Sequence, residues 1–296
     1  MKNKYAHIII GACLLLTIIG CTTPKIGIVF GGGGAKGAAE VGVLKVLEEA
    51  GIKADYIVGN SMGAVIGGLY AAGYTADEIE EMLLKEEWMW VFDEKKLFTI
   101  FSDKRYPTGL VSGPYFREQL DKVLTAKGAH LFHHIKTPFV CVATDLSKHP
   151  FEEVDMSEGV VAEAIRISMA YPVPGNAPIK MDGKELADGG IVNNLPVDVA
   201  RKMGADIVIA IDLEQGGNDF NIGIPTIEAI TEWLNTRPDI EKRLKNIDDA
   251  DIYIHPNLTG FSIKDYAPDS MSKMIEIGIK TAREQFEQLA EIGRNR

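Results

Sequence analysis

The sequence contains few histidines, no excess of positive charge and no segment with the composition of an interdomain linker. Its 31 lysines and arginines against 42 aspartates and glutamates give a formal net charge of −11. An acidic surface disfavours nucleic acid and anionic lipid headgroups as partners. No Ser-, Gly- or Pro-rich stretch and no fixed-period repeat divides the 296 residues, so a single domain is favoured. The hydrophobic content of 46% is typical of a globular protein with a sizeable core.

Residues 1–21 differ from the rest of the chain. A basic start, MKNK, precedes an apolar run from Ile8 to Ile19, which is shorter than the about 20 residues that a membrane span needs. This pattern predicts a signal peptide that is removed after export. The residues IIGC, ending at Cys21, also resemble the lipobox of bacterial lipoproteins. That resemblance implies cleavage before Cys21 and a lipid on this cysteine.

Cysteine is scarce, with three in the whole chain. Cys13 would leave with the signal and Cys21 would carry lipid, so Cys141 would be alone and no disulfide framework is expected in one mature chain. Cys141 lies in the apolar run PFVCVATDL and is predicted to be a buried small hydrophobe. Thr22 replaces the aspartate associated with inner-membrane retention in enteric bacteria. The expected location is therefore the bacterial cell envelope, at the periplasmic side of the outer membrane.

Short apolar runs alternate with helical patterns from Lys25 onward. Strands are predicted at 25–30, 55–59, 138–146 and 205–213. Helices are predicted after the glycines at 31–37, at 62–72, at 75–87 with a capping box at its start, at 114–124, at 159–170, at 195–204 and at 271–292. This alternation predicts an α/β fold with a largely parallel sheet.

Six of the 23 aromatic residues fall within residues 88–106, where the regular pattern fades. They are Trp88, Trp90, Phe92, Phe98, Phe101 and Tyr106. The segment from Trp88 to Tyr106 is interpreted either as a lid or acyl-chain surface, or as a small hydrophobic cluster under a loop.

A run of glycines, GGGGAKG from Gly31 to Gly37, follows the first predicted strand and precedes a helix. It contains the G-x-G-x-x-G pattern of dinucleotide-binding loops, and Asp55 follows at a suitable distance. However, Asp55 begins the second strand, whereas a ribose-binding acid belongs at the carboxyl end of that strand. A phosphate-binding P-loop is also disfavoured, because glycine follows Lys36. The remaining use is an oxyanion hole, since backbone N–H groups at a helix start stabilise negative charge.

The second predicted strand ends in GNSMG, which places Ser61 in a G-x-S-x-G pattern. Glycines on both sides permit a tight strand-to-helix turn that exposes the serine hydroxyl. Ser61 is therefore predicted to be a nucleophile. The glycine loop would supply the oxyanion hole of the same site.

The histidines that could accept the serine proton are His7, His130, His133, His134, His149 and His255. His7 would leave with the signal. The cluster at 130–134 precedes a strand and would lie at the sheet edge opposite to the site. It also lacks the Cys and acidic ligands of a metal centre. His149 and His255 stay open as alternatives, although surface or packing roles are favoured for both.

Three acids end predicted strands: Asp145 in VATDL, Asp188 in ELADGG and Asp212 in IAIDL. Only Asp188 is followed by two glycines, which would let the backbone of the nucleophile come close. The residues alone therefore favour Asp188 as the base without excluding the other two.

Together, GGGGAKG, GNSMG and DGGIVNN resemble the patatin-like phospholipase family, from Lys25 to Leu213 and more weakly beyond. The resemblance implies a three-layer α/β fold with a largely parallel central sheet, and no metal or organic cofactor. It also implies a Ser-Asp dyad with an oxyanion hole. Its site residues are the nucleophile Ser61, the proton acceptor Asp188, and the oxyanion-hole residues Gly32, Gly33, Gly34 and Met62.

Two further positions take their interpretation from this resemblance. Lys36 stands where arginine is common and is a candidate substrate contact. The segment AIRISMAYPVP is similar to a family segment that often reads S-x-A-x-P, and Ser168 and Pro172 match it. The usual phenylalanine after it is replaced by residues 175–177, GNA, which affects the pocket wall more than the chemistry.

The expected organisation is a lipoprotein signal peptide at residues 1–20, a lipidated tether at 21–24 and a patatin-like phospholipase domain at 25–296. The expected function is a serine acyl-ester hydrolase of phospholipase A or lysophospholipase type, acting on phospholipid or lysophospholipid and attached to its membrane through Cys21. Alternatives are a thioesterase, a short-chain esterase, or a non-catalytic lipid-binding envelope lipoprotein. The presence of both Ser61 and Asp188 argues against the last.

Overall fold

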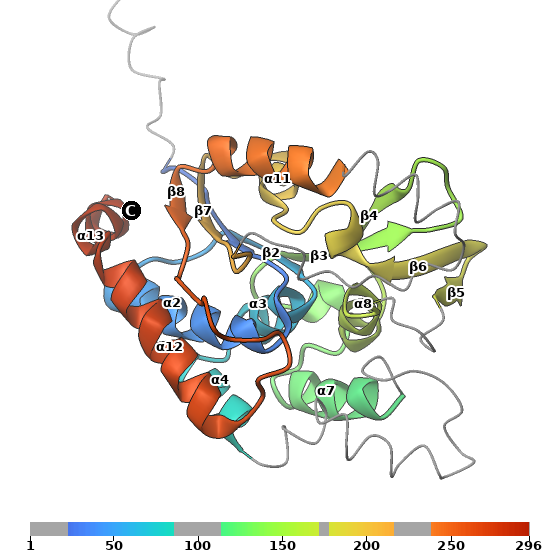
Figure 1. Ribbon diagram of the computed structural model, residues 1–296, viewed down its shortest axis with the longest axis horizontal. Helices are drawn as coiled ribbons and strands as arrows, with labels where there is room; N and C mark the ends of the chain where they lie inside the picture. Colours follow the sequence, from blue (N-terminus) through green and yellow to red (C-terminus); the bar gives the residue numbers. More distant parts are fainter. Residues whose placement is uncertain (1–22, 86–113, 172–177, 216–237, 296) are drawn as a thin grey trace, which may run out of the picture.

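The computed structural model describes residues 23–85, 114–171, 178–215 and 238–295 (Figure 1). The predicted signal peptide and Cys21 lie outside these residues. The aromatic segment 88–106 and the positions 172 and 175–177 of the family-like segment also lie outside them. The predictions for these segments stay predictions.

An eight-stranded sheet forms the centre of the fold, with the strand order β5-β6-β3-β2-β1-β7-β8 and β4 also paired with β3 (Figure 1). The strands are β1 Ile26–Phe30, β2 Tyr56–Asn60, β3 Phe139–Asp145, β4 Glu152–Met156, β5 Ile179–Met181, β6 Lys184–Asp188, β7 Ile207–Ile211 and β8 Ile252–Ile254. Strands β3, β2, β1, β7 and β8 pair in parallel, whereas β4 and β6 pair with β3 in the antiparallel sense. The predicted α/β fold with a largely parallel sheet is confirmed.

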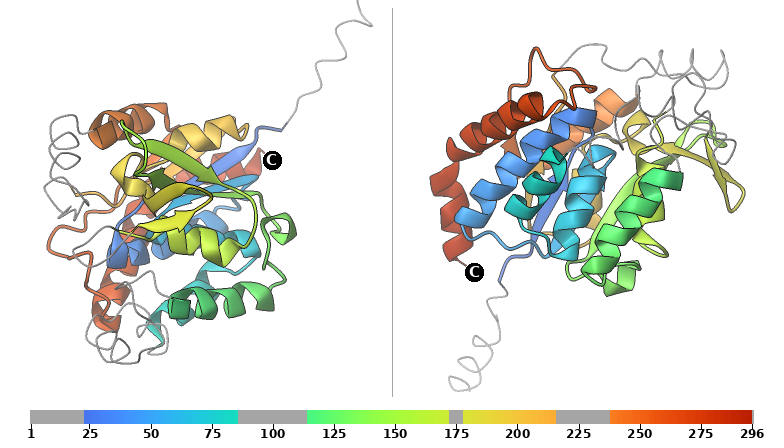
Figure 2. Two further views of the ribbon diagram at one scale, coloured as in Figure 1. Left: turned by 90° about the vertical axis from the view of Figure 1, so that its right-hand side faces the viewer. Right: turned by 90° about the horizontal axis from the view of Figure 1, so that it is seen from below.

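Helices cover both faces of this sheet, which makes a three-layer structure (Figures 1 and 2). One face packs against α2 Ala38–Glu49, α3 Met62–Ala72, α4 Ala76–Leu84, α7 Pro114–Ala126, α8 Val161–Ser168, α12 Pro268–Arg283 and α13 Phe286–Arg294. The other face packs against α9 Val197–Lys202 and α11 Pro238–Asp249. Short 3₁₀ turns are η1 Gly34–Gly37, η2 Phe132–His134 and η3 Gly189–Ile191.

The central strands are mostly apolar because both of their faces are covered. Every residue of β1 and of β3 is buried. Cys141 in β3 is fully buried and unpaired, as predicted, and burial raises the pKa of its thiol. The sequence runs IGIVF and FVCVATD are therefore core strands and not surface strands.

The predicted helix starts and ends are confirmed in part. Helix α4 begins with a capping box, in which Thr75 Oγ1 accepts from the Glu78 N–H at 3.2 Å and the Glu78 carboxylate accepts from the Thr75 N–H at 2.8 Å. The prediction of one tail helix over 271–292 is wrong, because the chain leaves helical geometry at Gln285 (φ −113°) and continues as α13. The Gln285 side chain donates to the Tyr253 carbonyl at 2.9 Å, which fixes this break.

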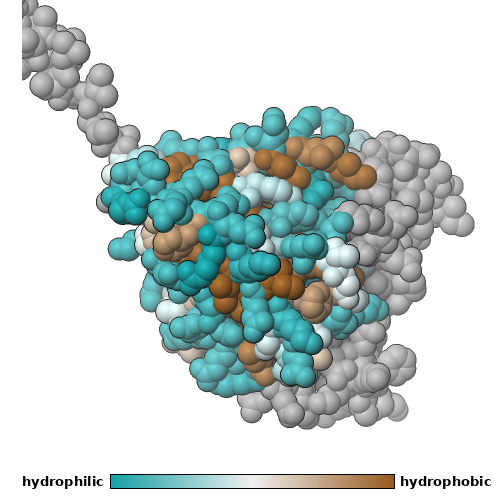
Figure 3. Space-filling view, turned by 60° about the vertical axis from the view of Figure 1, so that its left-hand side comes forward, coloured by the Kyte–Doolittle hydropathy of each residue, from teal (hydrophilic) through white to brown (hydrophobic). Residues whose placement is uncertain are grey.

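The face over α12 and α13 is mainly hydrophilic, with small hydrophobic patches between polar groups (Figure 3). Within the part of the chain that is described, no helix combines the length and the apolar character needed to cross a bilayer.

In the parallel register Phe30 pairs with Gly59 and with Ile211, so β1, β2 and β7 end at the same edge of the sheet. The loops that leave these strands therefore meet there.

Candidate active site

Ser61 forms the sharp turn between β2 and α3. Its backbone has φ 52° and ψ −122°, a left-handed region that a residue with a side chain seldom adopts and that costs about 1–3 kcal/mol. The glycine after Met62 permits the turn, because a Cβ atom on Gly63 would lie 2.4 Å from the Phe30 carbonyl oxygen. The predicted strand-to-helix turn is therefore present, and its strain is typical of a nucleophile held by its surroundings.

The backbone of Ser61 is held from the side by Ser168, the last residue of α8. The Ser61 N–H donates to Ser168 Oγ at 2.9 Å, and the Ser168 hydroxyl donates to the Val142 carbonyl of β3 at 2.6 Å. Ser168 is fully buried. The family-like segment thus contributes a side chain that ties the nucleophile turn to the neighbouring strand.

Asp188 ends β6 and is 3% exposed. Its carboxylate accepts hydrogen bonds from the Gly190 N–H at 2.8 Å and from Asn60 Nδ2 at 3.4 Å, and the Ser61 side chain lies beside it. Burial raises the pKa of Asp188 to about 6, and the interactions with Ser61, Gly190 and Asn60 only partly oppose this rise. The structure therefore brings the two residues of the predicted dyad together, with an acid that is a stronger base than an exposed aspartate.

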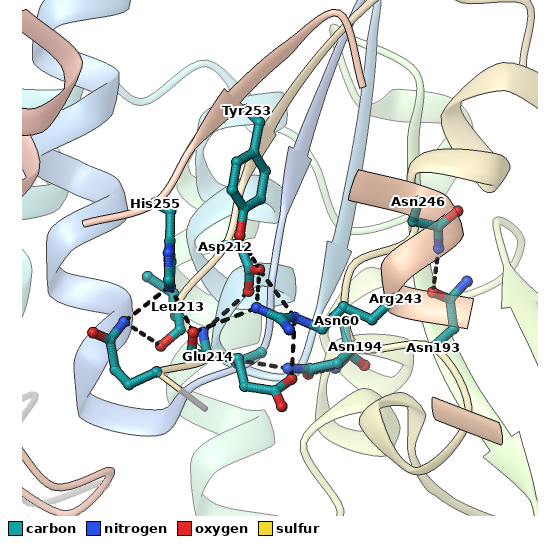
Figure 4. A network of polar contacts seen from close by, with 12 residues as sticks. Asn60, Asn193, Asn194, Asp212, Leu213, Glu214, Arg243, Asn246, Tyr253 and His255 are labelled. Atoms are coloured by element: carbon teal, nitrogen blue, oxygen red, sulfur yellow. Dashed lines mark hydrogen bonds and ion pairs between the residues drawn. The ribbon is translucent and has the colours of Figure 1, made fainter. Parts of the chain in front are cut away.

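The other two candidate acids are engaged elsewhere. Asp145 accepts from the Ser147 N–H at 3.0 Å, from Ser147 Oγ at 2.7 Å and from the Glu185 N–H at 3.2 Å. Burial raises the pKa of Asp145, but these hydrogen bonds outweigh it and hold the pKa below its ordinary value. Asp212 pairs with Arg243, whose Nε donates at 3.0 Å, and accepts from the Tyr253 hydroxyl at 2.7 Å (Figure 4).

The described histidines make their contacts away from the dyad. His130 Nδ1 lies 2.7 Å from Asp121, and the rings of His133 and His134 make an edge-to-face contact. His149 lies against Phe151, and His255 Nε2 lies 2.6 Å from the Glu214 carbonyl. Within the described ranges, no group of three or more His, Cys, Asp or Glu residues is arranged to hold a metal ion.

The glycine loop lies beside Ser61 at the end of β1. The Gly31 N–H donates to the Ile211 carbonyl at 3.0 Å and the Gly32 N–H to the Asn194 carbonyl at 3.2 Å. The amides of Gly33 and Gly34 donate to no acceptor in the described part of the chain. Met62 is the first residue of α3, where an N–H has no partner inside the helix.

This geometry revises the prediction for Gly32. Its N–H is already used inside the fold, so the amides left for an oxyanion are those of Gly33, Gly34 and Met62. The requirement for glycine at position 32 has another cause, since a Cβ atom there would lie 2.3 Å from Asn194 Oδ1.

Lys36 and Asp55 complete the predicted positions. Lys36 lies in η1 and is 3% exposed, so its ammonium is not presented on an open surface. Asp55 accepts from the Ile26 N–H at 2.9 Å and from the Lys25 ammonium at 3.1 Å. These contacts lie at the start of β1, at the edge opposite to the glycine loop, as expected if Asp55 binds no ribose.

Two asparagines were not singled out from the sequence as site residues. Asn60 precedes Ser61, and Asn194 ends the DGGIVNN run. Both are buried and lie between Asp188 and the glycine loop. Their place inside two of the three quoted motifs was the available signal, but it did not reveal their contacts.

Comparison with solved structures identifies the fold. Human GIVD cytosolic phospholipase A2 has a TM-score of 0.54 at 12% identity, over 92% of this chain and 60% of that chain. VipD from Legionella pneumophila has a TM-score of 0.53 at 16% identity, over 90% and 67%. At such low identities the similarity reports the fold, which is that of patatin-like proteins.

Comparison with known sequences identifies the family. Patatin-like phospholipase domain-containing protein 7 of Rattus norvegicus is 35% identical over 72% of this chain and 15% of its own length. An NTE family protein of Mycobacterium bovis is 32% identical over 74% of this chain and 57% of its own length. The chain therefore spans less than two thirds of these relatives. The patatin-like phospholipase profile matches residues 28–201, which is more than half of the chain. This chain belongs to the patatin-like phospholipase family.

Proposed function

We propose that this protein is a serine acyl-ester hydrolase of phospholipase A or lysophospholipase type, with Ser61 as nucleophile and Asp188 as proton acceptor. The observation that carries the proposal is the position of the Ser61 side chain beside a buried Asp188 whose pKa is raised to about 6. Membership of a family of lipid ester hydrolases supports the substrate class.

The reaction has two halves, both served by the same pair. Ser61 Oγ attacks the ester carbonyl carbon while its proton passes to Asp188. The tetrahedral intermediate then expels the alcohol, which takes the proton from Asp188 and leaves an acyl group on Ser61. Water attacks this acyl-enzyme and gives a proton to Asp188, which returns it to Ser61 as the fatty acid leaves. The sequence of steps balances without a cofactor.

The oxyanion hole must contribute much of the rate. An aspartate with a pKa of about 6 is a better base than one with a pKa near 4. The serine hydroxyl is still a far weaker acid than a protonated aspartate, so Asp188 alone cannot account for the transfer of its proton. The amides of Gly33, Gly34 and Met62 lie at or next to helix starts, where N–H groups favour negative charge. Each such donor contributes about 3–4 kcal/mol in comparable sites. We therefore expect hydrolysis of esters rather than amides.

Hydrolysis of a lipid panel tests the substrate class. Diacyl phospholipids, lysophospholipids, an acyl thioester and a short-chain aryl ester are compared with wild type and Ser61→Ala. The proposal expects release of fatty acid from phospholipid or lysophospholipid that is lost in Ser61→Ala. Turnover of only the thioester or only the aryl ester favours one of the alternative enzymes. Binding of lipid without turnover favours the non-catalytic alternative.

We infer further that the mature protein is attached to the bacterial envelope through a lipid on Cys21. The lipobox-like residues before Cys21 support this location. β1 starts next to Lys25 and ends next to the glycine loop, about 16 Å away, so the tether and the site would lie at opposite ends of this strand. Mass spectrometry of the mature N-terminus tests the lipid. An unmodified N-terminus, or unchanged membrane fractionation of Cys21→Ser, would contradict it.

A further inference from the structure

Two buried asparagines bridge the base and the glycine loop. Asn60 is fully buried and Asn194 is 4% exposed. Asn60 Nδ2 donates to Asn194 Oδ1 at 2.9 Å and to Asp188 Oδ1 at 3.4 Å. One side-chain amide therefore contacts both the base and the second asparagine.

Asn194 in turn holds the Gly32 peptide from two sides. Its Nδ2 donates to the Gly32 carbonyl at 3.2 Å, and its own carbonyl accepts from the Gly32 N–H at 3.2 Å. Burial raises the pKa of Glu214, and the Asn194 side chain partly opposes this rise. Glu214 belongs to the ion-paired group around Arg243 (Figure 4). Asn194 thus fixes the residue directly before the two free amides of the loop.

We propose that Asn60 and Asn194 are positioning residues that hold Asp188 and the oxyanion loop at a fixed separation. This inference rests on the proposed function, because it assigns the two amides a role in the same Ser61 chemistry. In the described structure, neither side chain makes a hydrogen bond to the Ser61 side chain. Asn60 acts through Asp188, and Asn194 acts through the glycine loop and through Asn60. Both asparagines are buried, so each hydrogen bond forms away from water and sets a geometry.

The pH dependence of the activity is a specific readout of the groups that contact Asp188. The influences on its pKa are burial and the interactions with Ser61, Gly190 and Asn60, and none of these three groups is charged. On the Asn194 side, Arg243 forms ion pairs with Asp212 and with Glu214. A donor to the ionised carboxylate lowers its pKa. Removal of the Asn60 amide therefore raises the pKa of Asp188.

The test compares Asn60→Ala and Asn194→Ala with Asn246→Ala. Asn246 is a matched control because it is 3% exposed and hydrogen-bonds Asn193 and Asp198, but neither Asp188 nor the glycine loop. For each variant, kcat, KM and the pH profile are measured with a soluble aryl ester. The inactivation rate with a fluorophosphonate and the thermal midpoint are measured in parallel.

We expect kcat to fall about 10- to 100-fold in Asn60→Ala and in Asn194→Ala, with KM changed less than about threefold. The acid limb of the kcat/KM profile moves to higher pH in Asn60→Ala and moves less in Asn194→Ala. The combined loss in the double variant is smaller than the product of the single losses, because the two residues share one hydrogen bond. Asn246→Ala keeps the wild-type kcat and acid limb.

The proposal is overturned if folded Asn60→Ala keeps the wild-type acid limb and kcat, or if Asn246→Ala shows the same loss. It is also overturned if the two single losses multiply in the double variant. Where Asn60→Ala does not fold, Asn60→Asp replaces it, and its expected effect is a larger upward shift of the acid limb. A wild-type protein that neither hydrolyses the ester nor reacts with the fluorophosphonate would instead contradict the proposed function.

Discussion

Asp188 and Asp212 are both buried at the carboxyl edge of one sheet, yet their surroundings differ in charge. Asp212 directly follows β7, and its buried carboxylate accepts hydrogen bonds from Arg243 and from the Tyr253 hydroxyl. Asp188 ends β6, and the groups that contact it are uncharged donors. Burial among uncharged groups raises the pKa of Asp188, whereas the carboxylate of Asp212 is held in an ion pair with Arg243. The comparison teaches that burial without a cation, more than position in the sheet, distinguishes the acid to which we assign proton transfer.

The largest expected effect comes from Asp188→Asn. This change keeps the shape of the side chain but removes the proton acceptor, so we expect kcat to fall by about 10³- to 10⁴-fold with the fold intact. Initial rates of ester hydrolysis measure it. Asp145→Asn is the control, because Asp145 is equally buried at a strand end but contacts Ser147 and Glu185. Loss of turnover in Asp145→Asn with activity kept in Asp188→Asn would assign the base elsewhere.

The second prediction concerns Asp212, the ion-paired acid of the comparison. Arg243→Met leaves Asp212 buried without its cation, so the free energy of unfolding should fall by about 3–5 kcal/mol in urea titrations. Arg283→Met removes a half-exposed pair with Glu49 and should lower the free energy of unfolding far less. Activity per folded molecule should stay within a few-fold in both. Equal losses of stability would mean that the Asp212 pair acts like a surface pair.

Several features that distinguish the two acids could be predicted from the sequence, and others could not. The motifs GNSMG and DGGIVNN identify Ser61 and Asp188, which the structure brings side by side. The partner of Asp212 was not predicted, because Arg243 lies in α11, a helix that was not among those predicted, and 31 residues separate the two along the chain. The contact of Asn60 with Asn194 also depends on tertiary structure, since 134 residues separate them along the chain.

The contacts of the glycine loop could also be predicted only in part. Its glycines predict close approach of a backbone, but which amide stays available depends on the carbonyl of Asn194, far along the chain. Asp188 was expected at the end of a strand, but the pairing of that strand, β6, with β5 in a hairpin was not predicted. Its strands are short, and β5 is exposed over most of its length, so it lacks the apolar run that marks the central strands.

The third prediction is the pH dependence that follows from the raised pKa of Asp188. Below a pH of about 6 the carboxyl group is protonated and cannot accept the Ser61 proton. We therefore expect kcat/KM to fall about tenfold per pH unit below pH 6 and to be flat just above it. A rate profile for a soluble aryl ester between pH 4 and 8 measures this limb. A limb near pH 4 would mean that the base is an ordinary exposed acid.

The smallest effect is expected from Glu40→Gln, which extends the comparison to a third buried acid. Glu40 lies in the first turn of α2 under the glycine loop, fully buried, and neither carboxyl oxygen has a hydrogen-bond partner in the described structure. Burial raises the pKa of Glu40 well above its usual value, the Gly31 amide partly opposes this rise and the charge of Asp212 adds to it.

The folded state therefore binds the Glu40 proton more tightly than the unfolded chain does. The stability that this gives is complete below the unfolded pKa and is lost as the pH rises through the folded pKa. Glutamine cannot ionise, so Glu40→Gln should raise the thermal midpoint at pH 8 and change it little at pH 4. A lower midpoint at pH 8 would mean that the ionised form of Glu40 stabilises the fold.

The central claim is that Ser61 is a nucleophile activated by Asp188. The most direct measurement is the rate at which a fluorophosphonate modifies the protein, followed by intact mass and by peptide mapping from pH 4 to 8. We predict one adduct, on Ser61, at a rate that decreases below a pH of about 6 and is at least 100-fold lower in Asp188→Asn. An adduct on another residue, or the same rate in wild type and Asp188→Asn, would contradict the claim.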